Sequence, residues 1–145
     1  MRRRYISAIF GMIIGSLTLY GAAFAHATEK HGKTAPADSR MKKLHAIMPM
    51  FSAASAELET ALEKGDAATA KTQAGRILEA LPDLKKSKPH KNIKQMSAYK
   101  AIADKMGNDI NTLVALAKSG NFVEAKRAFR NLEVRCAECH SKFRD

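Results

Sequence analysis

Apolar or small residues recur at alternating steps of three and four along four stretches of this chain, and this spacing constrains the fold more than any other feature. Such steps bring side chains to one face of an α-helix, whereas a half-buried strand would need alternation at every second position. The stripes consist of Met41, Leu44, Met48, Phe51, Ser55, Leu58 and Leu62, then Ala70, Ala74, Ile77, Leu78 and Leu81, then Met96, Tyr99, Ala103, Met106, Ile110, Leu113 and Ala117, and finally Phe122, Ala125, Phe129, Leu132, Cys136, Cys139 and Phe143. Each apolar face needs a partner that covers it, so the pattern predicts an all-α fold of four packed helices.

The connections between the stripes predict how the helices are arranged. We expect helices over residues 39–64, 67–81, 92–118 and 122–143. Gly65 followed by Asp66 is typical of one helix ending and the next being capped, and Ser-Gly-Asn at 119–121 is similar. Pro82 is expected to end the second helix, and Pro49 to kink the first or mark a late start. Because the first and third connections are short, we predict an up-down-up-down antiparallel four-helix bundle.

Composition limits the number of domains and the kinds of function. A chain of 145 residues is enough for one domain, and a 46% hydrophobic content without tryptophan suits a helical domain with an aliphatic core. The formal net charge of +11 suits acidic partners, but no nucleic-acid motif with interleaved aromatic residues is present. The sequence shows no paired carboxylates, nucleophile–base pair or phosphate loop, so we do not expect an enzyme.

The N-terminus has the three parts of an export signal. Arginines at positions 2 to 4 precede an uncharged apolar stretch at 6–20, and Ala23-Phe24-Ala25 forms a small-x-small cleavage site. We therefore predict a signal peptide at 1–25 that is cleaved after Ala25, and a periplasmic location. The alternative is an uncleaved anchor, because residues 5–25 are just long enough to span a bilayer.

The rest of the chain divides into two parts. Residues 26–37 are polar and lack periodicity, which predicts a flexible leader. Residues 38–145 contain all four stripes and are expected to form the folded domain.

Cys136, Cys139 and His140 form a Cys-x-x-Cys-His motif, the attachment signature of c-type haem. Positions three apart lie on one helical face, so both sulfurs can reach the two vinyl groups of one porphyrin. The imidazole of His140 projects from nearly the same side and can bind the iron. The motif predicts one covalently attached haem c near the C-terminus of the last helix.

Other uses of the two cysteines fit the sequence less well. A disulfide across two intervening residues closes too small a loop to stabilise a fold. A zinc site would need two further ligands at matching spacing, and none follows from the sequence. A thioredoxin-like redox pair would need a strand–helix context that this helical chain lacks. Chance placement is the remaining alternative, and the export signal and inward-facing positions count against it.

The antiparallel topology also predicts what faces the other side of the haem. The end of the fourth helix should lie beside the start of the first, so Met41, Leu44, His45 and Met48 are expected to line the distal face. Met48 is our provisional distal ligand because it lies deeper in the helix. Met41 and His45 are alternatives, and an open iron site is a further one.

The C-terminal sequence Cys136-Ala-Glu-Cys139-His140-Ser-Lys-Phe143-Arg144 resembles that of the class II c-type cytochromes, the cytochrome c-prime family and its low-spin relatives. That family carries its haem motif at the end of a four-helix bundle, followed by an aromatic and a basic residue. The resemblance implies that Cys136 and Cys139 carry the thioethers and that His140 is the proximal ligand.

The first helix is similar to the family in a looser way. Met41 and Lys42 are followed by Met48 seven residues on, as in many members. High-spin members leave the iron open to nitric oxide or carbon monoxide, whereas low-spin members bind it with a first-helix methionine. Pro49 and a short link between the first two helices depart from the family pattern, which leaves the sixth ligand open.

Three functions follow from these observations. We favour a periplasmic one-electron carrier, with the basic residues 85–94, Lys42 and Lys43 steering it to an acidic redox partner. The first alternative is a five-coordinate haem protein that binds nitric oxide or carbon monoxide. The second is a haem subunit of a larger oxidoreductase. A homodimer is implied by the resemblance alone.

Overall fold

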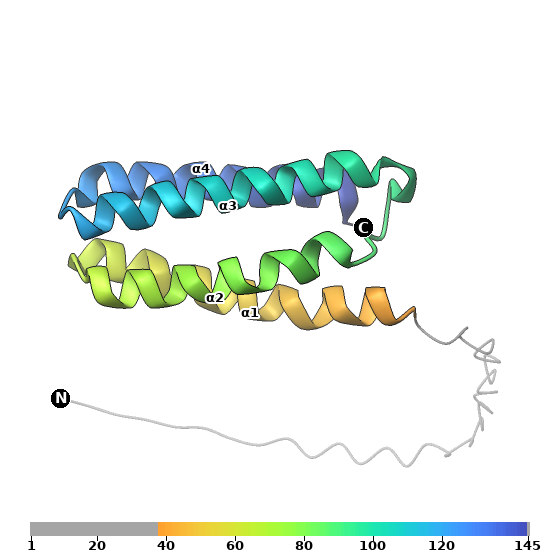
Figure 1. Ribbon diagram of the computed structural model, residues 1–145, viewed down its shortest axis with the longest axis horizontal. Helices are drawn as coiled ribbons and strands as arrows, with labels where there is room; N and C mark the ends of the chain where they lie inside the picture. Colours follow the sequence, from red (N-terminus) through yellow and green to blue (C-terminus); the bar gives the residue numbers. More distant parts are fainter. Residues whose placement is uncertain (1–37, 145) are drawn as a thin grey trace, which may run out of the picture. The chain divides into compact units, whose positions relative to one another are not determined.

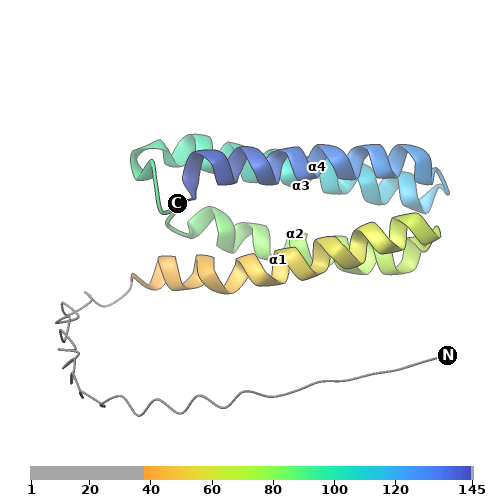
Figure 2. The same ribbon diagram turned by 180° about the vertical axis from the view of Figure 1, so that it is seen from behind.

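The computed structural model describes residues 38–144 and contains four long helices (Figure 1). They are α1 (Ser39–Lys64), α2 (Ala67–Lys86), α3 (Met96–Lys118) and α4 (Phe122–Phe143), with a short 3₁₀ helix, η1 (Ile93–Gln95), before α3. The helices pack as an antiparallel bundle in two layers, α1 with α2 and α3 with α4 (Figures 1 and 2). The predicted all-α, up-down-up-down bundle is therefore confirmed. The predicted signal peptide and leader lie outside the described residues.

Side-chain caps define three of the helix starts. The carboxylate of Asp38 accepts a hydrogen bond from the Arg40 backbone N–H at 3.0 Å, and that of Asp66 accepts one from Thr69 at 3.0 Å. The amide oxygen of Asn121 accepts from the Glu124 backbone N–H at 3.2 Å. These bonds satisfy donors that have no partner within a helix, which is why the predicted starts of α1, α2 and α4 are confirmed.

Two prolines lie within helices. Pro82 lies inside α2, which continues to Lys86, so the prediction that this helix ends at Leu81 is wrong. The cost of one missing backbone donor is offset because Leu84, two residues further on, is buried in the core. Pro49 lies inside α1, which already begins at Ser39, so this proline does not mark a late start of the helix.

The start of the third helix also differs from the prediction. Residue 92 was expected to begin it, but α3 begins at Met96 after the 3₁₀ turn. Asn92 has a left-handed conformation with φ 53° and ψ 36°, which is incompatible with a right-handed helix. The connection between α2 and α3 therefore runs over residues 87–95 and not over the expected residues 82–91.

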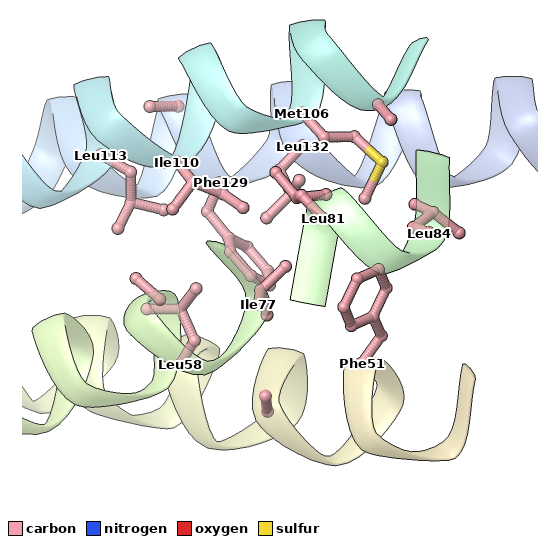
Figure 3. Packing of buried hydrophobic residues seen from close by; sticks show 14 of the residues in the cluster. Phe51, Leu58, Ile77, Leu81, Leu84, Met106, Ile110, Leu113, Phe129 and Leu132 are labelled. Carbon is pink, nitrogen blue, oxygen red and sulfur yellow. The ribbon is translucent and has the colours of Figure 1, made fainter. Parts of the chain in front are cut away.

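The core runs along the inside of the bundle and takes residues from every helix. Side chains from both layers point into one interior, with Phe51 reaching from α1 toward Leu84 and Phe129 reaching from α4 toward Ile77 (Figure 3). No helix within residues 38–144 is both long and apolar enough to cross a membrane. The predicted inward stripes are buried for the most part, and their fully covered members include Leu58, Ile77, Ile110, Leu113 and Leu132.

The two glycines at positions 65 and 75 predict opposite effects of one substitution. Gly65 ends α1 with φ 70°, whereas Gly75 lies inside α2 with open space where a Cβ would be. We expect Gly65→Ala to lower the free energy of unfolding by about 1–2 kcal/mol, because alanine is strained at positive φ. Gly75→Ala should raise it by about 0.5–1 kcal/mol, because glycine loses more backbone entropy in a helix. Urea unfolding of the two variants measures these changes. If both substitutions changed the free energy of unfolding in the same direction, the conformations of the two glycines would be contradicted.

Candidate haem site

The last two turns of α4 bring the three motif residues together. Cys136 and Cys139 are half-buried free thiols that pack against the edge of the core. His140 follows in the last turn and is more exposed. Since residues three and four apart share a helical face, the thiols and the imidazole lie on one side of α4. The motif predicts this common face for the two thiols and the imidazole.

A cavity of about 900 Å³ lies in front of this face. Cys136, Cys139 and His140 all line it from α4, and Met48 and His45 line it from α1. Its volume falls at the upper end of the range of roughly 300–1,000 Å³ that is typical of cofactor pockets. The bundle is thus hollow at the level of the motif, where a residue-filled core would leave no room for a porphyrin.

The walls of the cavity are mainly apolar. Leu44 and Phe51 contribute from α1, Tyr99 from α3, and Phe129 and Leu132 from α4. These side chains belong to the same buried cluster as the rest of the core. A mainly apolar wall with some polar groups suits a large flat cofactor with a metal at its centre.

The environment of each motif residue shifts its pKa. Burial raises the pKa of the Cys139 thiol to about 11, helped by the neighbouring Cys136 and Glu138. Burial also raises the pKa of Cys136, with a smaller contribution from Glu133. Both thiols are therefore protonated at neutral pH in the unmodified chain.

His140 is shifted in the opposite direction. Partial burial lowers its pKa, and the positive charge of Arg144 lowers it further. At neutral pH its imidazole is therefore neutral and keeps a lone pair with which to bind a metal ion. The residues of α4 thus fit the attachment and proximal binding of a haem iron.

The candidate distal residues are placed differently from one another. Met48 is partly buried and lines the cavity, as do Leu44 and His45. Met41 packs against the core but is not among the residues that line the cavity. The structure thus brings Met48 and His45 to the same cavity as the motif and leaves Met41 outside it.

His45 already has a partner at the edge of the cavity. Its Nε2 atom lies 3.1 Å from Nε2 of His90, and the two rings are stacked with centroids 5.1 Å apart. His90 and Pro89 both line the cavity, although the sequence analysis treated their loop as a basic surface only. The sequence indicates these two cavity residues only through the Pro-His pair itself, because the loop has no apolar periodicity that would predict burial.

A zinc site finds no support in the geometry. Within residues 38–144, no group of three or more histidine, cysteine or acidic side chains is arranged to hold a metal ion. The arrangement instead offers two thiols and one imidazole on the same helix.

Comparison with known proteins gives a match over the part of the chain that carries the motif. The family model described as Cytochrome C' matches residues 83–144, from the end of α2 through the haem motif of α4. No curated protein and no solved structure gives a significant match to the chain. Proteins of the matched family bind one covalently attached haem c. The matched part of the chain carries both cysteines and His140, and the match is consistent with a class II c-type cytochrome.

Proposed function

We propose that this protein is a periplasmic one-electron carrier in which Cys136 and Cys139 hold the haem and His140 is its proximal ligand. The observation that carries the proposal is the single cavity lined by the motif residues on α4 and by Met48 on α1. The bound haem supplies a reversible one-electron change at its iron. The signal-like N-terminus supports export, in keeping with a family that is typically periplasmic.

Met48 supports the carrier over a gas-binding protein. It is the one methionine of α1 that both lines the cavity and lies next to the apolar wall formed by Leu44 and Phe51. A thioether is a good sixth ligand for haem iron, and it would close the site to exogenous gases. His45 is a weaker candidate because its Nε2 atom already faces His90.

A five-coordinate site that binds nitric oxide or carbon monoxide is the second candidate. The observation that favours it is the apolar lining next to Met48, where a small uncharged gas would be accommodated without an ordered polar partner. A role as a subunit of a larger oxidoreductase would instead show itself as copurification in a stable complex.

The surface around the cavity end of the bundle supports docking to an acidic partner. Basic residues gather on residues 85–94 and at the start of α1. Several are partly neutralised, since Lys43 pairs with Asp83, Lys85 with Asp104 and Lys88 with Asp38. Three exposed lysines of this region, at positions 86, 91 and 94, form no ion pair within the described residues. These three are the ones expected to attract an acidic surface.

Loss of the thiols should release the haem. We expect the double variant Cys136→Ser, Cys139→Ser to lose all covalently bound haem, because serine cannot form the thioethers. Haem staining of a denaturing gel measures this directly. The variant Ser52→Ala, which changes a cavity residue away from the motif, serves as the control and should retain the stain. A stained double variant would contradict the assigned attachment.

Replacement of Met48 should decide between the two functions. The reduced wild-type protein is expected to show sharp α and β bands that do not change with carbon monoxide. Met48→Leu should convert it to a high-spin form that binds the gas, because leucine has no atom that binds iron. Met41→Leu is the matched control and should leave the spectrum unchanged, since Met41 is outside the cavity lining. A wild-type spectrum that shifts with carbon monoxide would favour the gas-binding protein.

Charge reversal at three surface lysines tests the docking surface. We expect Lys86→Glu, Lys91→Glu, Lys94→Glu to slow reduction by an acidic partner at least about tenfold at low salt. The difference should shrink at physiological ionic strength, where the screening length falls to about 8 Å. Lys64→Glu, Lys71→Glu, Lys118→Glu carries the same change in charge at the other end of the bundle. Equal rates for the two triple variants would remove the steering role.

A further inference from the structure

The proposed proximal ligand lies in a part of α4 that is prone to fraying. His140 is only three residues from the end of the helix at Phe143. The last four backbone carbonyls of an α-helix have no partner within the helix, and helix ends open easily for this reason. Arg144 N–H donates to the His140 carbonyl at 3.1 Å, which satisfies one of these four. The orientation of His140 therefore depends on which groups donate hydrogen bonds to the remaining carbonyls at the end of α4.

A loop from elsewhere in the chain supplies these partners. Residues 87–95, here called the strap, cross the C-terminal end of α4 (Figures 1 and 2). The backbone N–H groups of His90 and Lys91 donate to the Phe143 carbonyl at 3.1 and 3.2 Å. The side-chain amide of Asn92 donates from Nδ2 to the Lys142 carbonyl at 2.6 Å. The end of α4 is thus capped by the strap and not by its own continuation.

Asn92 is well suited to this role because of both its backbone and its side chain. Its φ of 53° makes it the one non-glycine residue with positive φ within residues 38–144. Asparagine tolerates this conformation better than most residues. Its amide oxygen faces Nε2 of Gln95 at 3.5 Å, and its own carbonyl accepts the Gln95 backbone N–H at 2.7 Å. The amide is therefore oriented with its donor toward α4.

The strap is itself fixed to the bundle. The hydroxyl of Ser87 lies 2.9 Å from that of Tyr99 and donates to the Leu84 carbonyl at 2.7 Å, and Ser87 is buried. The Tyr99 ring meets the Phe143 ring edge-on, with centroids 5.2 Å apart. A cap that is anchored on α2 and α3 can hold the end of α4 in one position relative to the rest of the bundle.

We propose that Asn92 is a positioning residue that fixes the last turn of α4, and with it the imidazole of His140. The proposal rests on the proposed binding of the haem iron by His140. Groups that orient a metal-binding imidazole without touching the metal change the absorption spectrum and the reduction potential of the metal centre. Asn92 acts here through the Lys142 carbonyl, two residues from His140 in the same helical turn.

The test compares two Asn→Gly changes at opposite ends of α4. Asn92→Gly keeps the positive φ and removes only the side-chain cap, and Asn121→Gly removes the cap at the start of the helix. Both are made in the haem-loaded protein, and haem staining first establishes that the cofactor is attached. Hydrogen exchange of the last turn of α4, the reduced absorption spectrum and the midpoint potential are then measured.

We expect Asn92→Gly to speed exchange in the last turn about fivefold, the effect of losing one hydrogen bond, and to shift the spectrum and potential. Asn121→Gly should affect exchange only at the start of α4 and leave the haem signals unchanged. A second variant, Asn92→Asp, keeps the size and backbone preference of asparagine but turns an acceptor toward the Lys142 carbonyl. It should therefore shift the spectrum and the potential at least as much as Asn92→Gly does. Faster exchange without any change in spectrum or potential would overturn the positioning role. Unchanged exchange would overturn the cap itself.

Discussion

The cavity between α1 and α4 is the feature on which the rest of the structure depends. Along most of its length the bundle is filled by its own side chains, with Leu58, Ile110 and Leu113 fully buried. At the motif end this packing stops, and about 900 Å³ is left in front of Cys136 and Cys139. Protein interiors are close-packed, and a gap of this size costs stability unless something fills it. Proteins of the matched family bind one covalently attached haem c, and such a group in this cavity would complete the core.

The chemistry of the site follows from its position at the edge of that core. Partial burial keeps the thiols protonated and the His140 imidazole neutral in the unmodified chain. A fully exposed motif would lack the apolar wall, and a fully buried one would give a redox partner no access. The half-buried cysteines and the exposed His140 would place a bound haem between these extremes. The same end of the bundle carries the lysines of residues 85–94, so the electrostatic surface and the site coincide.

Sequence periodicity was enough to predict the fold and the helix that carries the motif, because both depend on local rules. The bounds of α1 and α4 follow from the caps at Asp38 and Asn121 and from the apolar stripes. The end of α2 could not be predicted in this way, since Pro82 is a local signal for termination and the burial of Leu84 is a tertiary effect. Likewise, the placement of Met41 outside the cavity lining depends on how α1 is rotated against α4. The contact between His45 and His90 joins residues 45 positions apart, which no periodic pattern encodes.

The unexpected length of α2 explains how a loop can reach the helix that carries the Cys-x-x-Cys-His motif. Five further residues in helical conformation carry the chain about 7.5 Å beyond Leu81 along the bundle axis. This extension brings Ser87 to the buried hydroxyl of Tyr99 and starts the strap at the level where α4 ends. A helix that stopped before Pro82 would begin the loop more than one turn earlier, away from the Phe143 carbonyl. Leu84, whose buried side chain offsets the cost of Pro82 within α2, thereby contributes to the position of His140, the proposed proximal ligand on a different helix.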